Sequence, residues 1–180
     1  MKRTLGFLLI NLPLCLFAQH SLQFIGEDID FAINEDRFSV NGIYYFSNRT
    51  STAINQNILF PFAENADSLV IKRLYNLSSS ENIDYQLLNS AILFKIALRP
   101  KDTIQVNIAF SQKTESENIY VLESTQTWEE PLIHADYSLT FDKAVQIDSL
   151  SIEADSLINN VYFWTKHNFF PECNFIVWIK

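Results

Sequence analysis

The chain has 180 residues, of which 48% are hydrophobic, and its 13 Lys plus Arg against 21 Asp plus Glu give a net charge of −8. A negative surface repels phosphate groups, and the sequence holds no basic cluster, so this composition excludes nucleic acid as a partner and disfavours anionic membranes. The length suffices for one domain with a single core.

The first twenty residues have the layout of a secretory signal peptide. Lys2 and Arg3 precede an apolar run that ends at Ala18. A helix over this run would span about 20 Å, less than a bilayer core of about 30 Å, so a retained membrane anchor is disfavoured. We therefore predict a signal peptide over residues 1–18, cleaved near Ala18, and a single secreted or periplasmic domain over residues 19–180 that is not an integral membrane protein.

Cysteine usage excludes an internal disulfide. Once the leader is removed, Cys173 is the only remaining cysteine. Free cysteines are often buried, so a buried, inert thiol is the favoured interpretation. Pairing of Cys173 between two chains is the alternative.

The first two predicted strands cover residues 22–33 and 38–46, where apolar residues alternate with polar ones. We expect a break at Gly26 in the first strand. Gly42, on the apolar face of the second strand, indicates a bulge or a close backbone approach.

Three acidic residues in the first predicted strand invite a calcium hypothesis. Glu27, Asp28 and Asp30 lie close together, but calcium requires six to eight oxygen ligands and no Asp-rich loop follows. Charges that protect a sheet edge are the favoured interpretation.

The clearest pair of strands is a predicted hairpin. Residues 92–98 and 104–110 alternate cleanly around a turn at residues 99–102. An earlier strand over residues 54–62 contains Pro61, which cannot donate to a ladder, so this strand lies at an edge or ends there. Further strands are expected at residues 68–77, 85–88, 119–127, 133–141, 145–153, 157–166 and 175–179.

About nine to eleven strands at this spacing predict an all-β fold, specifically an antiparallel β-sandwich, with a barrel as the alternative. The segment from Tyr120 to Tyr137, with Trp128 and Pro131 at its corner, combines with Tyr44–Asn48 and Phe60–Phe62 into a pattern that resembles secreted bacterial immunoglobulin-like sandwich domains. The resemblance covers roughly residues 38–142. It implies an immunoglobulin-like fold and an extracytoplasmic location, and it carries no function.

The corner of this segment is a candidate binding site. Trp128, Glu129 and Glu130 are consecutive and could form a ligand patch. The favoured interpretation is structural: Trp128 closes the corner of the sandwich, with two solvated carboxylates beside it.

His134 and Asp136 lie two residues apart, so on a strand they point the same way and could act as a charge pair or as two metal ligands. A third ligand is missing, which favours a solvated outer face. We predict no metal and no cofactor.

Aromatic residues near the C-terminus give a second candidate site. Trp164 and Trp178, if exposed, could stack on sugars or anchor a protein partner. Packing in the core is the favoured interpretation, because Phe and Trp are more often packing residues than platforms.

No catalytic motif is present, and consecutive carboxylates such as Glu129 and Glu130 face opposite sides of a strand and cannot flank one bond. We predict a non-catalytic envelope or extracellular component that binds another protein through a strand edge or the Trp128 corner. The alternatives are a carbohydrate-binding module that recognises a glycan through its C-terminal aromatics, and a small hydrolase without a recognisable motif.

Overall fold

The computed structural model describes residues 21–63 and 69–180; the predicted signal peptide lies outside these ranges. The described residues form fourteen strands and a 3-10 helix, more strands than the nine to eleven expected; the expected strand over residues 157–166 is divided in two, and residues 81–82 form an additional short strand. The elements are β1 Leu22–Ile33, β2 Arg37–Asn48, β3 Ile54–Pro61, β4 Val70–Asn76, β5 Glu81–Asn82, β6 Tyr85–Leu87, β7 Ala91–Leu98, β8 Thr103–Lys113, β9 Glu117–Tyr120, η2 Glu123–Trp128, β10 Leu132–Phe141, β11 Ile147–Leu150, β12 Ser156–Ile158, β13 Val161–Phe169 and β14 Phe175–Ile179.

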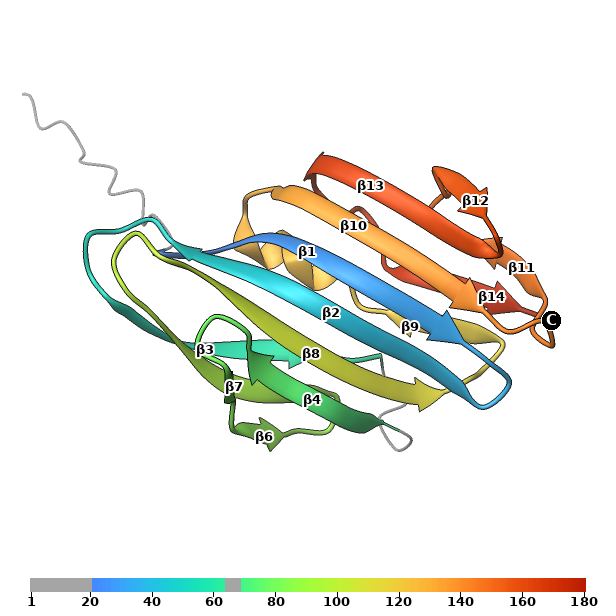
Figure 1. The fold of residues 1–180 in the computed structure, drawn as a ribbon, viewed down its shortest axis with the longest axis horizontal. Helices are drawn as coiled ribbons and strands as arrows, with labels where there is room; N and C mark the ends of the chain where they lie inside the picture. Colours follow the sequence, from blue (N-terminus) through green and yellow to red (C-terminus); the bar gives the residue numbers. More distant parts are fainter. Residues whose placement is uncertain (1–20, 64–68) are drawn as a thin grey trace, which may run out of the picture.

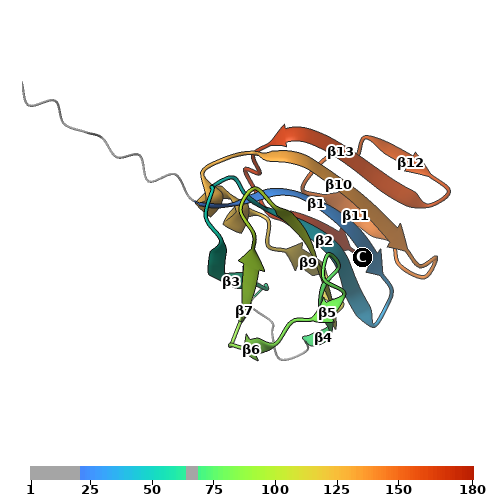
Figure 2. The same ribbon diagram turned by 60° about the vertical axis from the view of Figure 1, so that its left-hand side comes forward.

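The strands form one large sheet and two small ones, which confirms the all-β class (Figure 1). The large sheet has the order β12-β13-β10-β1-β2-β8-β4-β5; the first small sheet has the order β3-β7-β6 and the second β11-β14-β9. Figure 2 shows the large sheet as a curved layer with both small sheets on its concave side. The expected antiparallel arrangement is present only in part, because β1 and β10 pair in parallel while the other strand pairs are antiparallel. The long connection between β1 and β10 allows the crossover that a parallel pair needs.

Stacked aromatic rings join the small sheets to the large one. Phe31 of β1 stacks on Phe175 of β14 with ring centroids 4.3 Å apart, and Tyr44 of β2 meets Phe60 of β3 edge to face at 5.2 Å. The buried apolar side chains of all three sheets belong to one cluster. The fold therefore rests on the burial of one continuous apolar interior, at about 1.5–3 kcal/mol for each large side chain.

The predicted hairpin is not a hairpin. Its two strands exist as β7 and β8, with the expected apolar residues buried, but β7 pairs with β3 and β6 while β8 pairs with β2 and β4. The turn between them carries Lys101 at a φ of 60° and crosses from one sheet to another. Alternation shows which face of a strand is apolar, but it does not show whether the next strand lies beside it or opposite it.

The end of β3 agrees with the sequence. β3 is an edge strand of the first small sheet, and it ends at Pro61. The expected strand over residues 119–127 is wrong in its second half, where the chain forms η2. The side-chain oxygen of Asn174 accepts hydrogen bonds from the backbone N–H groups of Leu122 and Glu123 at 2.8 and 3.0 Å. These backbone groups therefore bond to a side chain and not to a neighbouring strand.

Three other expectations are corrected. Cys173 is exposed, so the buried-thiol interpretation is wrong. Alternation over residues 133–141 predicts Ile133 on the dry face of its strand, but this residue is 49% exposed, because Leu132 takes the buried position there. Asp28 and Asp30 do not protect an edge, since β1 lies inside the large sheet between β10 and β2. In the parts of the chain that the structure describes, there is no helix of the length and apolarity needed to cross a bilayer.

Candidate functional site

A carboxyl group on β1 points into the protein interior. Glu27 stands opposite Tyr44 and in step with the inward residues that follow it on β1. A bulge at Ile25, where the pairing with β2 shifts between Phe24 and Gly26, brings Leu22 and Phe24 to the same inner face. Glu27 is only 1% exposed. A side chain at position 26 would collide with the imidazole of His134, which lies 2.3 Å from the place of its Cβ.

Three tyrosines from three different strands surround this carboxyl group. The hydroxyl of Tyr137, on β10, donates to Oε1 of Glu27 at 2.6 Å, and that of Tyr120, on β9, donates to Oε2 at 2.9 Å. The hydroxyl of Tyr44, on β2, lies 3.2 Å from that of Tyr120. The four side chains form one hydrogen-bonded cluster, which we call the Glu27 cluster.

Burial has the largest effect on the pKa values of the Glu27 cluster. Loss of solvation raises the pKa of Glu27 from 4.5 to about 7, although the hydrogen bonds from Tyr137 and Tyr120 act to lower it. Burial, followed by the nearby Glu27 charge, raises the pKa of all three tyrosines well above 10. The tyrosines therefore stay protonated near neutral pH, while Glu27 exists in both forms.

A cavity of about 290 Å³ opens beside the Glu27 cluster. Its walls come from β1, β2, β3 and the segment leading through η2. Trp128 of η2 lies 6.0 Å from the ring of Phe24 and 5.9 Å from that of Phe46, which makes one side aromatic. Polar groups lie at other points of the lining, among them Gln56, Asn57, Ser124, Thr125 and Thr127.

Gly42 makes room for one member of the cluster. A Cβ at this position would lie 2.6 Å from Oη of Tyr44 and 2.6 Å from Cδ1 of Ile29. The ring of Tyr44 therefore occupies the space that a side chain at position 42 would need. The expected close approach at this glycine is confirmed.

The predicted corner site is only partly at the cavity. Trp128 lines it, whereas Glu129 and Glu130 are exposed. Glu129 ends η2 at a φ of 62°, and its N–H donates to the carbonyl of Gln126. Glu130 forms an exposed ion pair with Arg49 at 3.4 Å.

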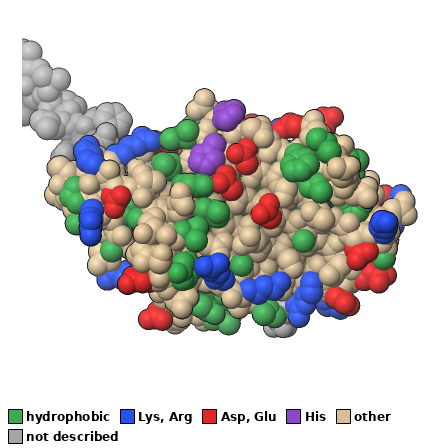
Figure 3. All heavy atoms as spheres, viewed as in Figure 1, with side chains coloured by type: hydrophobic (Ala, Val, Ile, Leu, Met, Phe, Trp, Pro, Cys, Tyr) green, Lys and Arg blue, Asp and Glu red, His purple; other side chains and the backbone are tan. Residues whose placement is uncertain are grey.

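His134 and Asp136 lie on the outer face of the large sheet, away from the cavity. Nε2 of His134 is 3.5 Å from Oδ1 of Asp28, and its ring meets Tyr45 edge to face at 4.8 Å. Asp136 stands opposite Asp28 in the parallel ladder. Histidine and acidic side chains gather on this face (Figure 3). Among residues 21–63 and 69–180, no three His, Cys, Asp or Glu are placed to hold a metal ion.

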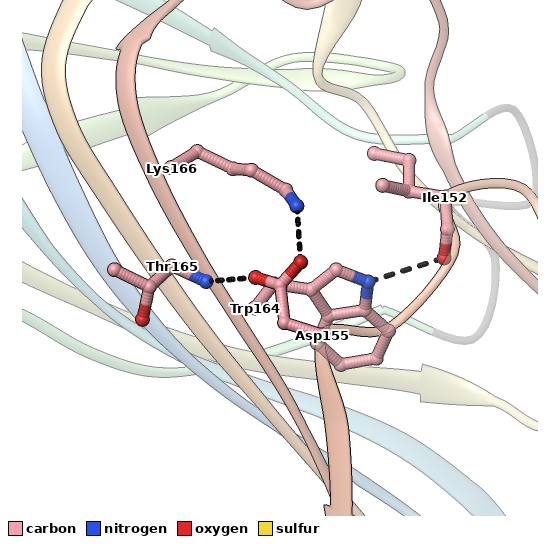
Figure 4. Close-up of polar contacts among 5 residues, drawn as sticks. All are labelled: Ile152, Asp155, Trp164, Thr165 and Lys166. Carbon is pink, nitrogen blue, oxygen red and sulfur yellow. Dashed lines mark hydrogen bonds and ion pairs between the residues drawn. The ribbon is translucent and has the colours of Figure 1, made fainter.

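Trp164 packs in the core, as the favoured interpretation expects, and it forms no platform with Trp178. Trp164 is 1% exposed, and its indole Nε1 donates to the carbonyl of Ile152 at 3.1 Å (Figure 4). Asp155 also stabilises β13, because its carboxylate accepts hydrogen bonds from the N–H of Thr165 and the ammonium of Lys166, each at 2.7 Å. The hydrogen bond from Lys166, more than any other contact, holds the pKa of Asp155 below its usual value.

Trp178 is half-buried on β14, in a different sheet from Trp164. It stands between Ser149 of β11 and Glu117 of β9. The two indoles therefore cannot act as one coplanar surface.

Sequence reasoning missed the Glu27 cluster. A signal was available, because counting back in steps of two from Ile33 through Phe31 and Ile29 leads to Glu27 on the apolar face. No local signal in the sequence indicates that three tyrosines join Glu27 in this cluster. Tyr44, Tyr120 and Tyr137 each appear as an ordinary aromatic residue on the apolar face of a strand.

No family model matches the sequence, and no curated protein does. The fold is similar to that of a candidate nutrient-binding protein from Legionella pneumophila, with a TM-score of 0.71 and 12% identity over 89% of this chain and 67% of that one. It is also similar to an M1 zinc metallopeptidase from Deinococcus radiodurans, with a TM-score of 0.56 and 11% identity over 89% of this chain.

A leukotriene A4 hydrolase from Saccharomyces cerevisiae gives a TM-score of 0.52 at 8% identity over 88% of this chain. The chain spans 43% of the metallopeptidase and 29% of the hydrolase. At these identities the likeness shows a shared fold and nothing of the chemistry.

Proposed function

We propose that this protein is an exported, non-catalytic binding protein that holds a small molecule in the aromatic cavity beside the Glu27 cluster. Its location outside the cytoplasm rests on the predicted leader over residues 1–18. The immunoglobulin-like relationship stays a prediction.

One observation carries the proposal: a cavity of about 290 Å³ combines aromatic walls with a buried, ionisable polar cluster. Ligand sites in proteins are concave, mostly apolar and supplied with a few convergent polar groups, and perturbed pKa values concentrate in them. The volume fits a small ligand at the lower end of the usual range. A nutrient-binding role suggested for the Legionella protein supports the same class of function through fold alone.

The experiment is a thermal-shift screen of small neutral, cationic and anionic metabolites, with a blocking variant and a matched control. Gln56→Phe places a ring at the cavity wall, while Asn55→Phe adds the same ring at the adjacent exposed position of β3, outside the cavity. We expect compounds that raise the Tm of the wild type and of Asn55→Phe but not of Gln56→Phe. If no compound raises the Tm of the wild type, or if the compounds raise the Tm of Gln56→Phe by the same amount, the cavity is not the ligand site.

Binding of an envelope protein is a second candidate, favoured by an apolar edge strand. β12 ends the large sheet, and it exposes Leu157 by 54% and Ile158 by 56%. Exposed edges of this kind can accept a strand from a partner. A pull-down from envelope extract should recover one stoichiometric protein with the wild type and lose it with Ile158→Lys. A glycan array beside it tests the carbohydrate alternative.

A further inference from the structure

The ligand class follows from the charge balance of the cavity. Glu27 is a buried carboxyl group, and the groups that bond to it are the neutral hydroxyls of Tyr120 and Tyr137. None of the described residues that line the cavity is a Lys, Arg or His. An ionised Glu27 therefore has no positive partner within the cavity, and a buried charge of this kind is stable only when a partner is supplied.

The carboxyl group keeps capacity for such a partner. Its two oxygens offer about four lone-pair positions, and the tyrosine hydroxyls occupy two of them. An ammonium group in the cavity could use the rest, either by hydrogen bonds or, when fully methylated, by charge alone.

The walls favour a cation as well. The cavity lining includes the rings of Phe24, Tyr44, Phe46, Phe60 and Trp128. The face of an aromatic ring is negative and attracts ammonium groups within about 6 Å. The net charge of −8 adds a long-range attraction for cations and repels anions.

We infer that the ligand of this cavity is a small organic cation, an amine or quaternary ammonium with a compact apolar body, whose charge lies against Glu27 and whose body lies against Trp128. This inference rests on the proposed function. It adds the chemical class of the ligand and gives Glu27 the role of counter-ion.

Calorimetric titrations with two matched pairs of probes test it. Choline is compared with 3,3-dimethylbutan-1-ol, which has the same shape without the charge, and phenethylammonium with 2-phenylethanol. Glucose and 3-phenylpropanoate represent neutral sugars and anions. We expect each cation to bind the wild type at least about tenfold more tightly than its neutral counterpart, a free-energy difference of about 1.4 kcal/mol.

Two variants separate charge from shape. Glu27→Gln removes the carboxylate and should bring each cation within about twofold of its neutral counterpart. Asp30→Asn removes one negative charge from the same strand on the outer face, where Asp30 accepts a bond from Ser138, and should keep the tenfold preference. Loss of the preference in both variants would point to net charge and overturn the role of Glu27.

The pH gives an independent readout, because choline itself does not titrate. The titratable groups facing Glu27 are Tyr44 from β2, Tyr120 from β9 and Tyr137 from β10, all protonated near neutrality; Asp28, next along β1, points to the outer face. Only the ionised form of Glu27 attracts the cation, so choline should bind at least about tenfold more weakly at pH 5.5 than at pH 8.5. A flat profile would contradict the inference.

The outcomes for ligand class and for function are distinguishable. If neutral and charged probes bind equally and Gln56→Phe blocks both, the cavity is a ligand site and the inference about the cation is wrong. If no probe of any charge binds to the wild type, both the inference and the proposed function are wrong.

Discussion

Glu27 is held in the interior without a positive partner, at a cost in stability that depends on pH. Its pKa of about 7, against 4.5 for an unburied glutamate, means that the native protein keeps a proton that the unfolded chain has released between these two pH values. The free energy of unfolding therefore decreases as the pH rises through this window and levels off above about pH 8.

A variant isolates this contribution. In the wild type, Glu27 lowers the free energy of unfolding by an amount on the order of 3 kcal/mol between pH 4.5 and 8. Glu27→Gln is neutral at every pH, so we expect this part of the decrease to be absent in the variant. Urea unfolding of both proteins across this range measures the difference. Parallel curves for the two proteins would assign the decrease to other groups.

Gly42 positions Tyr44 by leaving space for it. In Gly42→Ala the added methyl group would lie 2.6 Å from the hydroxyl oxygen of Tyr44, inside a packed core. We expect a loss of about 1–3 kcal/mol of stability by urea unfolding, together with weaker ligand binding, because overpacking displaces the ring.

Gly26→Ala provides a contrast for this prediction. Its added methyl group meets the imidazole of His134, which lies on the outer face of the sheet and can rotate away. We expect a smaller loss than for Gly42→Ala. An equal loss in both variants would mean that the outer face is packed as rigidly as the core.

At the scale of elements, β14 is the strand that fixes the second small sheet to the large one. Phe175 on β14 stacks on Phe31 of β1 and meets Trp164 of β13 edge to face at 5.1 Å. Phe175→Ala should cost about 3–5 kcal/mol, as expected for a fully buried ring whose space cannot collapse. The measurement is chemical denaturation followed by circular dichroism.

The matched control removes a ring of the same kind at the surface. Phe170 is exposed, so Phe170→Ala should change stability by less than about 1 kcal/mol. A small loss in Phe175→Ala, close to that of the control, would show that the second small sheet contributes little to the fold.

On the scale of the whole molecule, the three sheets share one apolar cluster. We therefore expect the described part of the chain to unfold in a single transition, with far-ultraviolet circular dichroism and tryptophan fluorescence giving the same midpoint. Fluorescence and circular dichroism that change at different denaturant concentrations would show that one sheet unfolds separately.

The pairing of distant strands explains why only part of the candidate site could be predicted from the sequence. The sequence indicates Trp128 as a corner residue, and the structure places it on the cavity wall. Tyr120 and Tyr137 reach Glu27 from positions 93 and 110 residues away along the chain, and such distances leave no local pattern. Trp164 shows a residue type that leaves packing and a platform both open, with packing favoured, and its position in β13 buries it.

The amino-acid sequence by itself determined the all-β class and most of the strand positions and apolar faces, because period-two alternation is a local consequence of the pleat. Only the tertiary structure decided that β7 and β8 lie in different sheets, that β10 runs parallel to β1, and that Tyr120 and Tyr137 meet Glu27 in the interior. Strand partners and side-chain clusters depend on contacts between distant segments, and alternation along one segment carries no information about them.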